Sequence, residues 1–187
     1  MSTTFSLLGI SGSLRAASFS TAVLRAAIDV APADTDLTLW RDLAGVPPFN
    51  EDHEDDPGPA VTAMRESITA ADALVIATPE YNTSIPGQLK NALDWASRPY
   101  GESVLVGKPV AVIGVSTSDY GADWSQQALR KVLAVSGAEV LETRLCVPRA
   151  DALVDGDGRL TDTETTGRLR DLVVDLRGLL RHETKAA

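Results

Sequence analysis

Short β-prone runs alternate with longer segments of helical period along most of the chain, and this alternation limits the possible folds more than any other feature. The predicted strands are Thr4–Ile10, Asp36–Arg41, Ala73–Thr78, Pro109–Ser116 and Glu139–Leu145. The predicted helices are Ser18–Val30, Ala60–Ala71, Pro86–Ser97, Ser125–Ser136 and Thr163–Arg181. The predicted order is therefore a βα unit repeated along the chain.

This order predicts an α/β protein with a doubly wound parallel sheet, because right-handed βα crossovers place helices on both faces. Five strands favour the flavodoxin-like order 2-1-3-4-5 in a three-layer sandwich. The run Ala73–Thr78 is apolar at every position but the last, as expected for a central strand. Because 187 residues suit one domain, we expect residues 1–187 to form a single flavodoxin-like domain. Ligands of such a fold bind beyond the carboxyl ends of the strands.

The charge balance limits the partners of the chain. Acidic residues exceed basic ones by 26 to 17, and the formal net charge of −9 repels nucleic-acid phosphates and anionic lipid surfaces. We therefore expect neither nucleic acid nor a membrane as a partner, and the longest apolar runs are too short to span a bilayer. Cys146 is the single cysteine, and the first residues lack the basic start and cleavage site of a signal peptide. A cytoplasmic location is expected.

The loop after the first predicted strand has the properties of an anion site. It enters a helix, whose first N–H groups and dipole favour negative charge. Arg15 adds a guanidinium fork that suits a phosphate dianion. The hydroxyl donors of this loop are Ser11, Ser13, Ser18 and Ser20. Helix capping is the ordinary role of a serine at such a turn, but it accounts for Ser18 alone.

Three common motifs are absent from this loop, and their absence narrows the ligand. No Gly-Lys-Ser/Thr closes the segment, which disfavours a nucleoside triphosphate. If Gly9 began a dinucleotide fingerprint, glycines would be needed at Ser11 and Leu14, so NAD is not held here in Rossmann fashion. A nucleophile elbow would need glycine where Ser13 stands, which leaves a hydrolase as a weak alternative.

A second polar loop follows the third predicted strand, Ala73–Thr78. The third strand neighbours the first in the predicted sheet, so the two loops face one crevice. Pro79 stiffens the exit, and Tyr81 offers an aromatic surface for an apolar ring. Backbone groups around Glu80 and Asn82 are positioned to bind the polar edge of a flat heterocycle. The ligand expected from both loops is a mononucleotide with such a ring.

Together the loops resemble the NADPH-dependent FMN reductase family, which includes bacterial quinone, chromate and azo dye reductases. The resemblance covers most of the chain and rests on residues 12–20, 78–82, 86–95 and 107–109. It implies bound FMN, with NADPH or NADH as co-substrate. The FMN-contacting residues it implies are Ser11, Ser13, Arg15, Ser18, Phe19, Ser20, Pro79, Glu80, Tyr81, Asn82, Ser116 and Gly121.

Two segments depart from the family pattern. Ser20 stands where the family usually has asparagine as a phosphate ligand, although serine can still donate one hydrogen bond. Residues 117–124 stand where relatives tend to have a glycine pair followed by small or basic residues, which bears on substrate preference. No metal site is expected, because His53 and His182 lack ligands at suitable spacing. Cys146 is interpreted as a small apolar residue.

The resemblance implies an enzyme that transfers electrons from NAD(P)H to quinones or similar small acceptors by ping-pong kinetics. The flavin would carry the chemistry, so no catalytic side chain is assigned. Two alternatives are a flavin reductase that supplies reduced FMN to a monooxygenase and a flavodoxin-type electron carrier. The resemblance also implies a homodimer or a tetramer.

Overall fold

The computed structural model describes residues 4–186, with side chains up to residue 180. Its central sheet is parallel throughout and has the order β2-β1-β3-β4-β5, with β6 also paired to β4. The strands are β1 (Phe5–Ser11), β2 (Thr35–Trp40), β3 (Ala73–Thr78), β4 (Pro109–Val115), β5 (Glu139–Val140) and β6 (Leu145–Val147). The predicted α/β class and strand order are confirmed.

The fifth predicted strand is divided in two. β5 pairs with the first residues of β4, and β6 pairs with its last three. Two side chains of a neighbouring helix donate hydrogen bonds to backbone carbonyls on either side of the interruption. Arg130 donates to the Leu141 carbonyl at 2.7 Å, and the buried amide of Gln126 donates to the Leu145 carbonyl at 2.7 Å. These polar contacts replace continuous strand pairing, which periodicity alone does not reveal.

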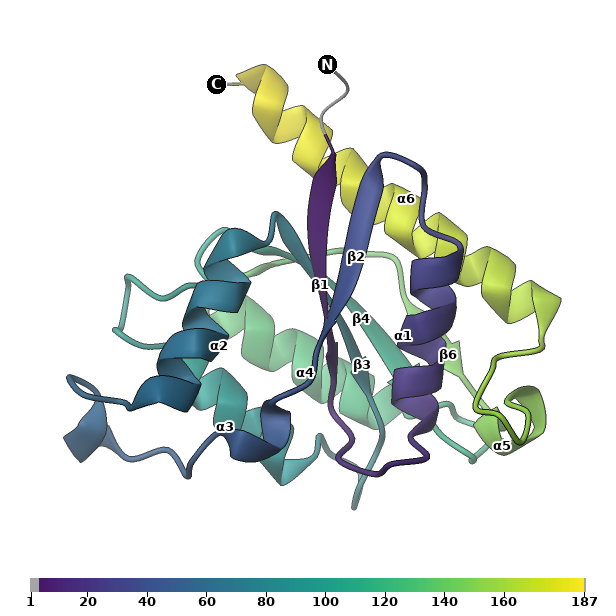
Figure 1. The fold of residues 1–187 in the computed structure, drawn as a ribbon, viewed down its shortest axis with the longest axis horizontal. Coiled ribbons are helices and arrows are strands. Elements are labelled where there is room, and N and C mark those ends of the chain that lie inside the picture. The colour runs from purple at the N-terminus through teal and green to yellow at the C-terminus, as the bar shows by residue number, and fades with distance from the viewer. Residues whose placement is uncertain (1–3, 187) are drawn as a thin grey trace.

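Helices cover both faces of the sheet (Figure 1). The helices are α1 (Phe19–Asp29), α2 (Pro59–Ala70), α3 (Gly87–Ala96), α4 (Asp123–Val135), α5 (Ala150–Leu153) and α6 (Thr163–Ala186). Residues of α1, α5 and α6 join one hydrophobic cluster with the sheet, and residues of α2, α3 and α4 join the other. The predicted three-layer sandwich is therefore confirmed.

The two central strands fix where polar loops can emerge. Every residue of β3 and β4 is buried, so exposed polar side chains appear only beyond the ends of these strands. Ser11 of β1 lies beside Ala77, and Thr78 of β3 lies beside Gly114. The loops after β1, β3 and β4 consequently leave the sheet at the same edge, as the sequence predicts.

The tight hairpin Val154–Leu160 connects α5 with the segment before α6. Val154 and Leu160 form an antiparallel bridge, and the Asp155 N–H donates to the Arg159 carbonyl at 2.9 Å. α5 and two short 3-10 turns at Leu43–Gly45 and Glu51–His53 are additions to the predicted elements. Among residues 4–186, no helix combines the length and apolar character that crossing a membrane requires.

Candidate functional site

A cavity of about 110 Å³ lies at the carboxyl ends of β1, β3 and β4. It is bordered by Ser13, Arg15, Ser18, Phe19, Ser20, Pro79, Glu80, Tyr81, Val115, Ser116 and Thr117. Nine of these residues belong to the site expected from the sequence, so segments far apart along the chain meet at one place. Val115 and Thr117 are additions, because the apolar end of a strand and a neutral hydroxyl give no distinctive sequence signal.

Three residues of the expected site do not border this cavity. The first is Ser11, whose Oγ accepts the Thr21 hydroxyl at 2.9 Å and the Ser13 N–H at 3.4 Å. Thr21 lies in the first turn of α1. Ser11 therefore fastens the loop to the helix that it enters.

Asn82 and Gly121 have positions in tight turns. Asn82 and Thr83 both have positive φ, 52° and 60°, in a turn closed by two hydrogen bonds between the backbones of Tyr81 and Ser84. Gly121 has φ of 59°, and its carbonyl oxygen would lie 2.5 Å from a Cβ at Gly114. The absence of a side chain at Gly114 thus allows the loop after β4 to press against that strand, and Gly121 supplies the positive φ of the turn.

The first turn of α1 leaves donors for an anion. Ser18 caps this helix by accepting the Thr21 N–H at 3.2 Å, and its carbonyl accepts the Ala22 N–H at 3.0 Å. The N–H groups of Phe19 and Ser20 precede these and have no acceptor within the helix. Since the hydroxyl of Ser18 uses only its oxygen in the cap, its proton is available to a ligand.

Ser20 carries the most informative atom of the site. Its side chain is 1% exposed, and its Oγ has no hydrogen-bond partner among the described residues. A buried hydroxyl without a partner is costly, unless a ligand supplies one. Arg15 lies at the same end with its guanidinium 5.7 Å from the centre of the Phe19 ring. The donors at this end of the cavity are of the kind that suits a phosphate.

Close packing of the two loops depends on Gly12. Its N–H donates to the Ala77 carbonyl at 2.8 Å. A Cβ at Gly12 would lie 2.8 Å from Leu89 Cδ2, 3.3 Å from the Ala77 oxygen and 3.4 Å from Pro79 Cδ. The absence of a side chain therefore lets the β1 loop approach β3 and α3 closely.

A buried hydrogen-bond network supports the loop after β3. Ser125 Oγ donates to the Pro79 carbonyl at 2.8 Å and lies 2.9 Å from Thr78 Oγ1. Both hydroxyl residues are fully buried. Glu80 Oε2 accepts the Ser125 N–H at 3.1 Å. The sequence pattern does not reveal Thr78 and Ser125 as supports, because their pairing joins residues far apart along the chain.

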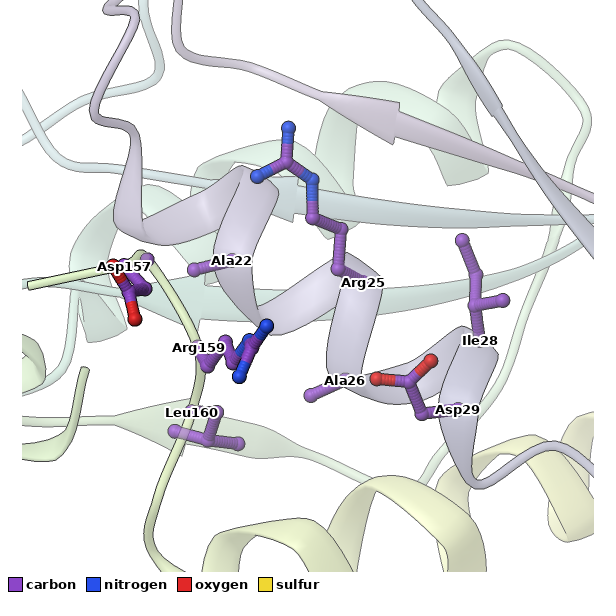
Figure 2. Close-up of a pocket in the computed structure, with 9 residues that line it drawn as sticks. Ala22, Arg25, Ala26, Ile28, Asp29, Asp157, Arg159 and Leu160 are labelled. Atoms are coloured by element: carbon purple, nitrogen blue, oxygen red, sulfur yellow. The ribbon is translucent and has the colours of Figure 1, made fainter. Parts of the chain in front are cut away.

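A larger cavity, of about 470 Å³, lies on the outer side of α1 against the Val154–Leu160 hairpin (Figure 2). Figure 2 shows Arg25 and Asp29 on the helix and Asp157 and Arg159 on the hairpin side. These two guanidinium groups and two carboxylates balance in charge, so the cavity offers no net positive charge to a phosphate. It also lies away from the strand ends, which makes the smaller cavity the better candidate.

Other reactive groups are not arranged for catalysis. Among the described residues, no cluster of three or more His, Cys, Asp or Glu side chains is placed to hold a metal ion. His53 is exposed in a 3-10 turn, and the side chain of His182 lies outside the described residues. Burial raises the pKa of the Cys146 thiol, and the Asp123 carboxylate raises it further. A raised thiol pKa disfavours the reactive thiolate.

The chain is similar in sequence to flavin-dependent reductases. The profile of the NADPH-dependent FMN reductase family matches residues 5–151. An NAD(P)H-dependent FMN reductase of Pseudomonas aeruginosa is 43% identical over 164 residues, which cover 87% of this chain and 88% of that protein. A 2-hydroxy-1,4-benzoquinone reductase of a Burkholderia species is 38% identical over 155 residues, which cover 82% of this chain and 84% of that protein.

A solved structure agrees with these matches along almost the whole chain. The flavoenzyme NAD(P)H:(acceptor) oxidoreductase FerB of Paracoccus denitrificans superimposes with a TM-score of 0.85 at 30% identity. The superposition covers 95% of this chain and 98% of FerB. The sequence match spans most of the chain and includes both loops of the cavity. The chain therefore belongs to the NADPH-dependent FMN reductase family.

Proposed function

We propose that this protein is an FMN-dependent NAD(P)H oxidoreductase that reduces quinones or similar small acceptors. The observation that carries the proposal is the unpartnered, buried hydroxyl of Ser20 beside the amino end of α1. Ser20 borders a cavity at the strand ends, where doubly wound folds bind their ligands. Membership of the family and the names of the similar proteins support the same activity.

The proposed site has a phosphate end and a ring end. The phosphate would accept hydrogen bonds from Ser20, Arg15 and the first N–H groups of α1. The full phosphate set is Ser13, Arg15, Ser18, Phe19 and Ser20. The ring edge would lie against Pro79, Glu80, Tyr81 and Asn82, with Ser116 on the far side. Ser11 and Gly121 would contribute by holding the loops in place.

Bound FMN would supply the hydride and electron chemistry, which no side chain of the cavity can provide. In the overall reaction, NAD(P)H gives up a hydride, and the quinone gains that hydride and one proton to become a hydroquinone. The protein would orient the cofactor through its two ends and limit access by water. Both substrates would use the open side of the cavity in turn, which predicts ping-pong kinetics.

The test is reconstitution of the purified protein with FMN. We expect flavin absorption bands that remain after desalting, and NADPH or NADH oxidation that depends on added 1,4-naphthoquinone. Failure to retain FMN at micromolar protein would contradict the proposal. Rapid loss of reduced FMN to solution would favour a flavin reductase that serves a monooxygenase. Slow NAD(P)H oxidation with every acceptor would instead favour an electron carrier.

We also propose that residues 1–187 act as one domain, in the cytoplasm, as a homodimer or tetramer. One surface that supports association surrounds a cavity of about 320 Å³ between the α3–β4 connection and the end of α4. Tyr100, Val106 and Val135 border this cavity and are all more than half exposed. Light scattering after size exclusion tests the assembly, and a monomer at micromolar concentration would contradict it.

A further inference from the structure

Two exposed aromatic side chains lie together in the segment that departs from the family pattern. The rings of Tyr120 and Trp124 have centroids 5.3 Å apart and planes tilted by 44°. Their side chains are 64% and 49% exposed. Aromatic surface of this size is costly to leave in water, which points to a binding role.

The pair is joined to the border of the cavity through Ser118 and through the chain on either side. The Tyr120 N–H donates to Ser118 Oγ at 3.3 Å, and Ser118 Oγ accepts the hydroxyl of Ser116 at 3.0 Å. Ser116 borders the cavity. On the other side, Trp124 immediately precedes Ser125, whose N–H is held by Glu80 of the ring end. The aromatic pair therefore adjoins the ring end rather than the phosphate end.

The backbone beneath the pair is fixed on both sides. The Asp123 N–H donates to the Tyr120 carbonyl at 3.2 Å. The Asp123 carboxylate accepts hydrogen bonds from Arg144 and from Gln127. Ala122 has φ of 63° and is fully buried, which fixes the entry into α4. On such a support the entropic cost of ligand binding is confined mainly to the two side chains and does not include the backbone.

The distribution of exposed apolar side chains points to a flat ligand. Leu14, Tyr81, Tyr120 and Trp124 are large apolar side chains, each about half exposed or more, and they follow β1, β3 and β4 at one edge of the sheet. Among the described residues, the only other aromatic side chain with comparable exposure is Tyr100, in the α3–β4 connection. Aromatic faces bind planar rings by offset or edge-to-face contact.

We propose that Tyr120 and Trp124 form the platform that binds the aromatic ring of the electron acceptor, and that they select fused-ring quinones over non-planar acceptors. This inference rests on the proposed function and deepens it. The net charge of −9 is consistent with it, because a strongly acidic protein favours neutral acceptors over anionic ones. The pair acts by binding and orientation and takes no part in electron transfer.

The experiment compares the FMN-loaded wild type with Trp124→Ala, Trp124→Phe and Tyr120→Ala. The equilibrium probe is 1-naphthol, a planar compound that cannot be reduced by the flavin, followed by its effect on flavin absorption. We expect Trp124→Ala and Tyr120→Ala to weaken 1-naphthol binding roughly 3- to 10-fold, from the free energy of an aromatic pair. Trp124→Phe should restore most of the binding.

The kinetic arm uses 1,4-naphthoquinone and ferricyanide with NADPH. The kcat/KM ratio of naphthoquinone to ferricyanide should fall several-fold in both alanine variants, mainly through the KM of the quinone. Val174→Ala is the control, because it removes an exposed apolar side chain of α6 that does not border the cavity. Its ratio should equal that of the wild type.

Three outcomes overturn the inference. One is unchanged 1-naphthol affinity in both alanine variants, and another is an equal loss with both acceptors. The third is a lower sedimentation coefficient of Trp124→Ala, which would make the pair a contact between copies of the chain. Failure of the proposed function is distinguishable, because a wild type that does not retain FMN lacks flavin bands before any variant is compared, and an FMN-loaded wild type inactive with every acceptor would still bind 1-naphthol through the pair.

Discussion

The carboxylate of Glu80 accepts the backbone N–H of Ser125 at 3.1 Å, so the loop after β3 caps the amino end of α4. A carboxylate at this position meets an unsatisfied donor and the positive end of the helix dipole. One side chain thus connects the ring end of the candidate cofactor site with a helix that begins in the segment after β4.

Two substitutions of Glu80 separate the contribution of its hydrogen-bond acceptor from that of its negative charge. Glu80→Ala should lower the free energy of unfolding by about 1 kcal/mol, because the Ser125 N–H loses its acceptor. Glu80→Gln keeps an acceptor oxygen and should lose less. Urea unfolding measures both, and Glu102→Ala, at an exposed position, is the control. Equal stability of Glu80→Ala and Glu102→Ala would show that the cap contributes nothing.

Ser11 at the end of β1 and Ser20 in the first turn of α1 should affect the stability of the apoprotein in opposite ways. Ser20→Ala removes a buried hydroxyl without a partner, so the apoprotein should be as stable as the wild type or more stable. Its FMN affinity should fall about tenfold or more, because a hydrogen bond to a charged phosphate is lost, worth about 1.5 kcal/mol. Thermal unfolding without FMN and fluorescence titration with FMN measure the two effects.

Ser11→Ala is the matched control for that pair of measurements. It removes the acceptor of the Thr21 hydroxyl and the Ser13 N–H, so the apoprotein should lose about 1 kcal/mol. FMN affinity should then fall less than in Ser20→Ala. If the two variants behave alike in both assays, Ser20 has no special role toward the phosphate.

A side chain at Gly12 should separate the two loops of the site. Gly12→Ala places Cβ 2.8 Å from Leu89 and 3.3 Å from the Ala77 oxygen, and we expect a loss of about 1–3 kcal/mol. Weaker FMN binding should accompany it. Gly178→Ala, in α6 with no atom within 4 Å of the added Cβ, should instead stabilise by up to about 1 kcal/mol. Chemical denaturation tests whether the free energy of unfolding falls in Gly12→Ala and rises in Gly178→Ala.

The pattern of apolar residues along the sequence predicts the layers of this fold well, because the burial of strands and helices determines that pattern directly. Every residue of β3 and β4 is buried, and their apolar runs stand out in the sequence. The division between β5 and β6 was not predicted, because it depends on carbonyls that Arg130 and Gln126 reach from α4. Such contacts depend on tertiary placement, which a local pattern does not contain.

Prediction of the candidate site from the sequence is limited in the same way. The strand-to-helix turn and its hydroxyls predict the residues that border the cavity after β1 and β3. Sequence chemistry did not distinguish Ser20, whose hydroxyl lacks a partner, from Ser11, whose oxygen fastens the loop. Ser11 ends β1 and Ser20 lies in the first turn of α1, and only the folded chain shows which hydroxyl is left without a partner.

Cys146 should react slowly with iodoacetamide. Burial and the nearby Asp123 carboxylate raise the pKa of its thiol, so at pH 8 the folded protein holds less thiolate than an exposed cysteine. The rate should rise with pH beyond the usual thiol range and should increase on unfolding in urea. Asp123→Asn should lower the pKa and speed the reaction. Faster alkylation of the folded than of the unfolded chain at pH 8 would contradict this.

The division of the fifth strand also affects how molecules of this protein meet at high concentration. A long, regular sheet margin offers a row of backbone donors and acceptors to strands of other chains, and so promotes aggregation. At the β4 side, the margin consists of two residues in β5 and three in β6, separated by a segment whose carbonyls are partly taken by side chains. Intermolecular strand addition is therefore disfavoured at this side of the molecule.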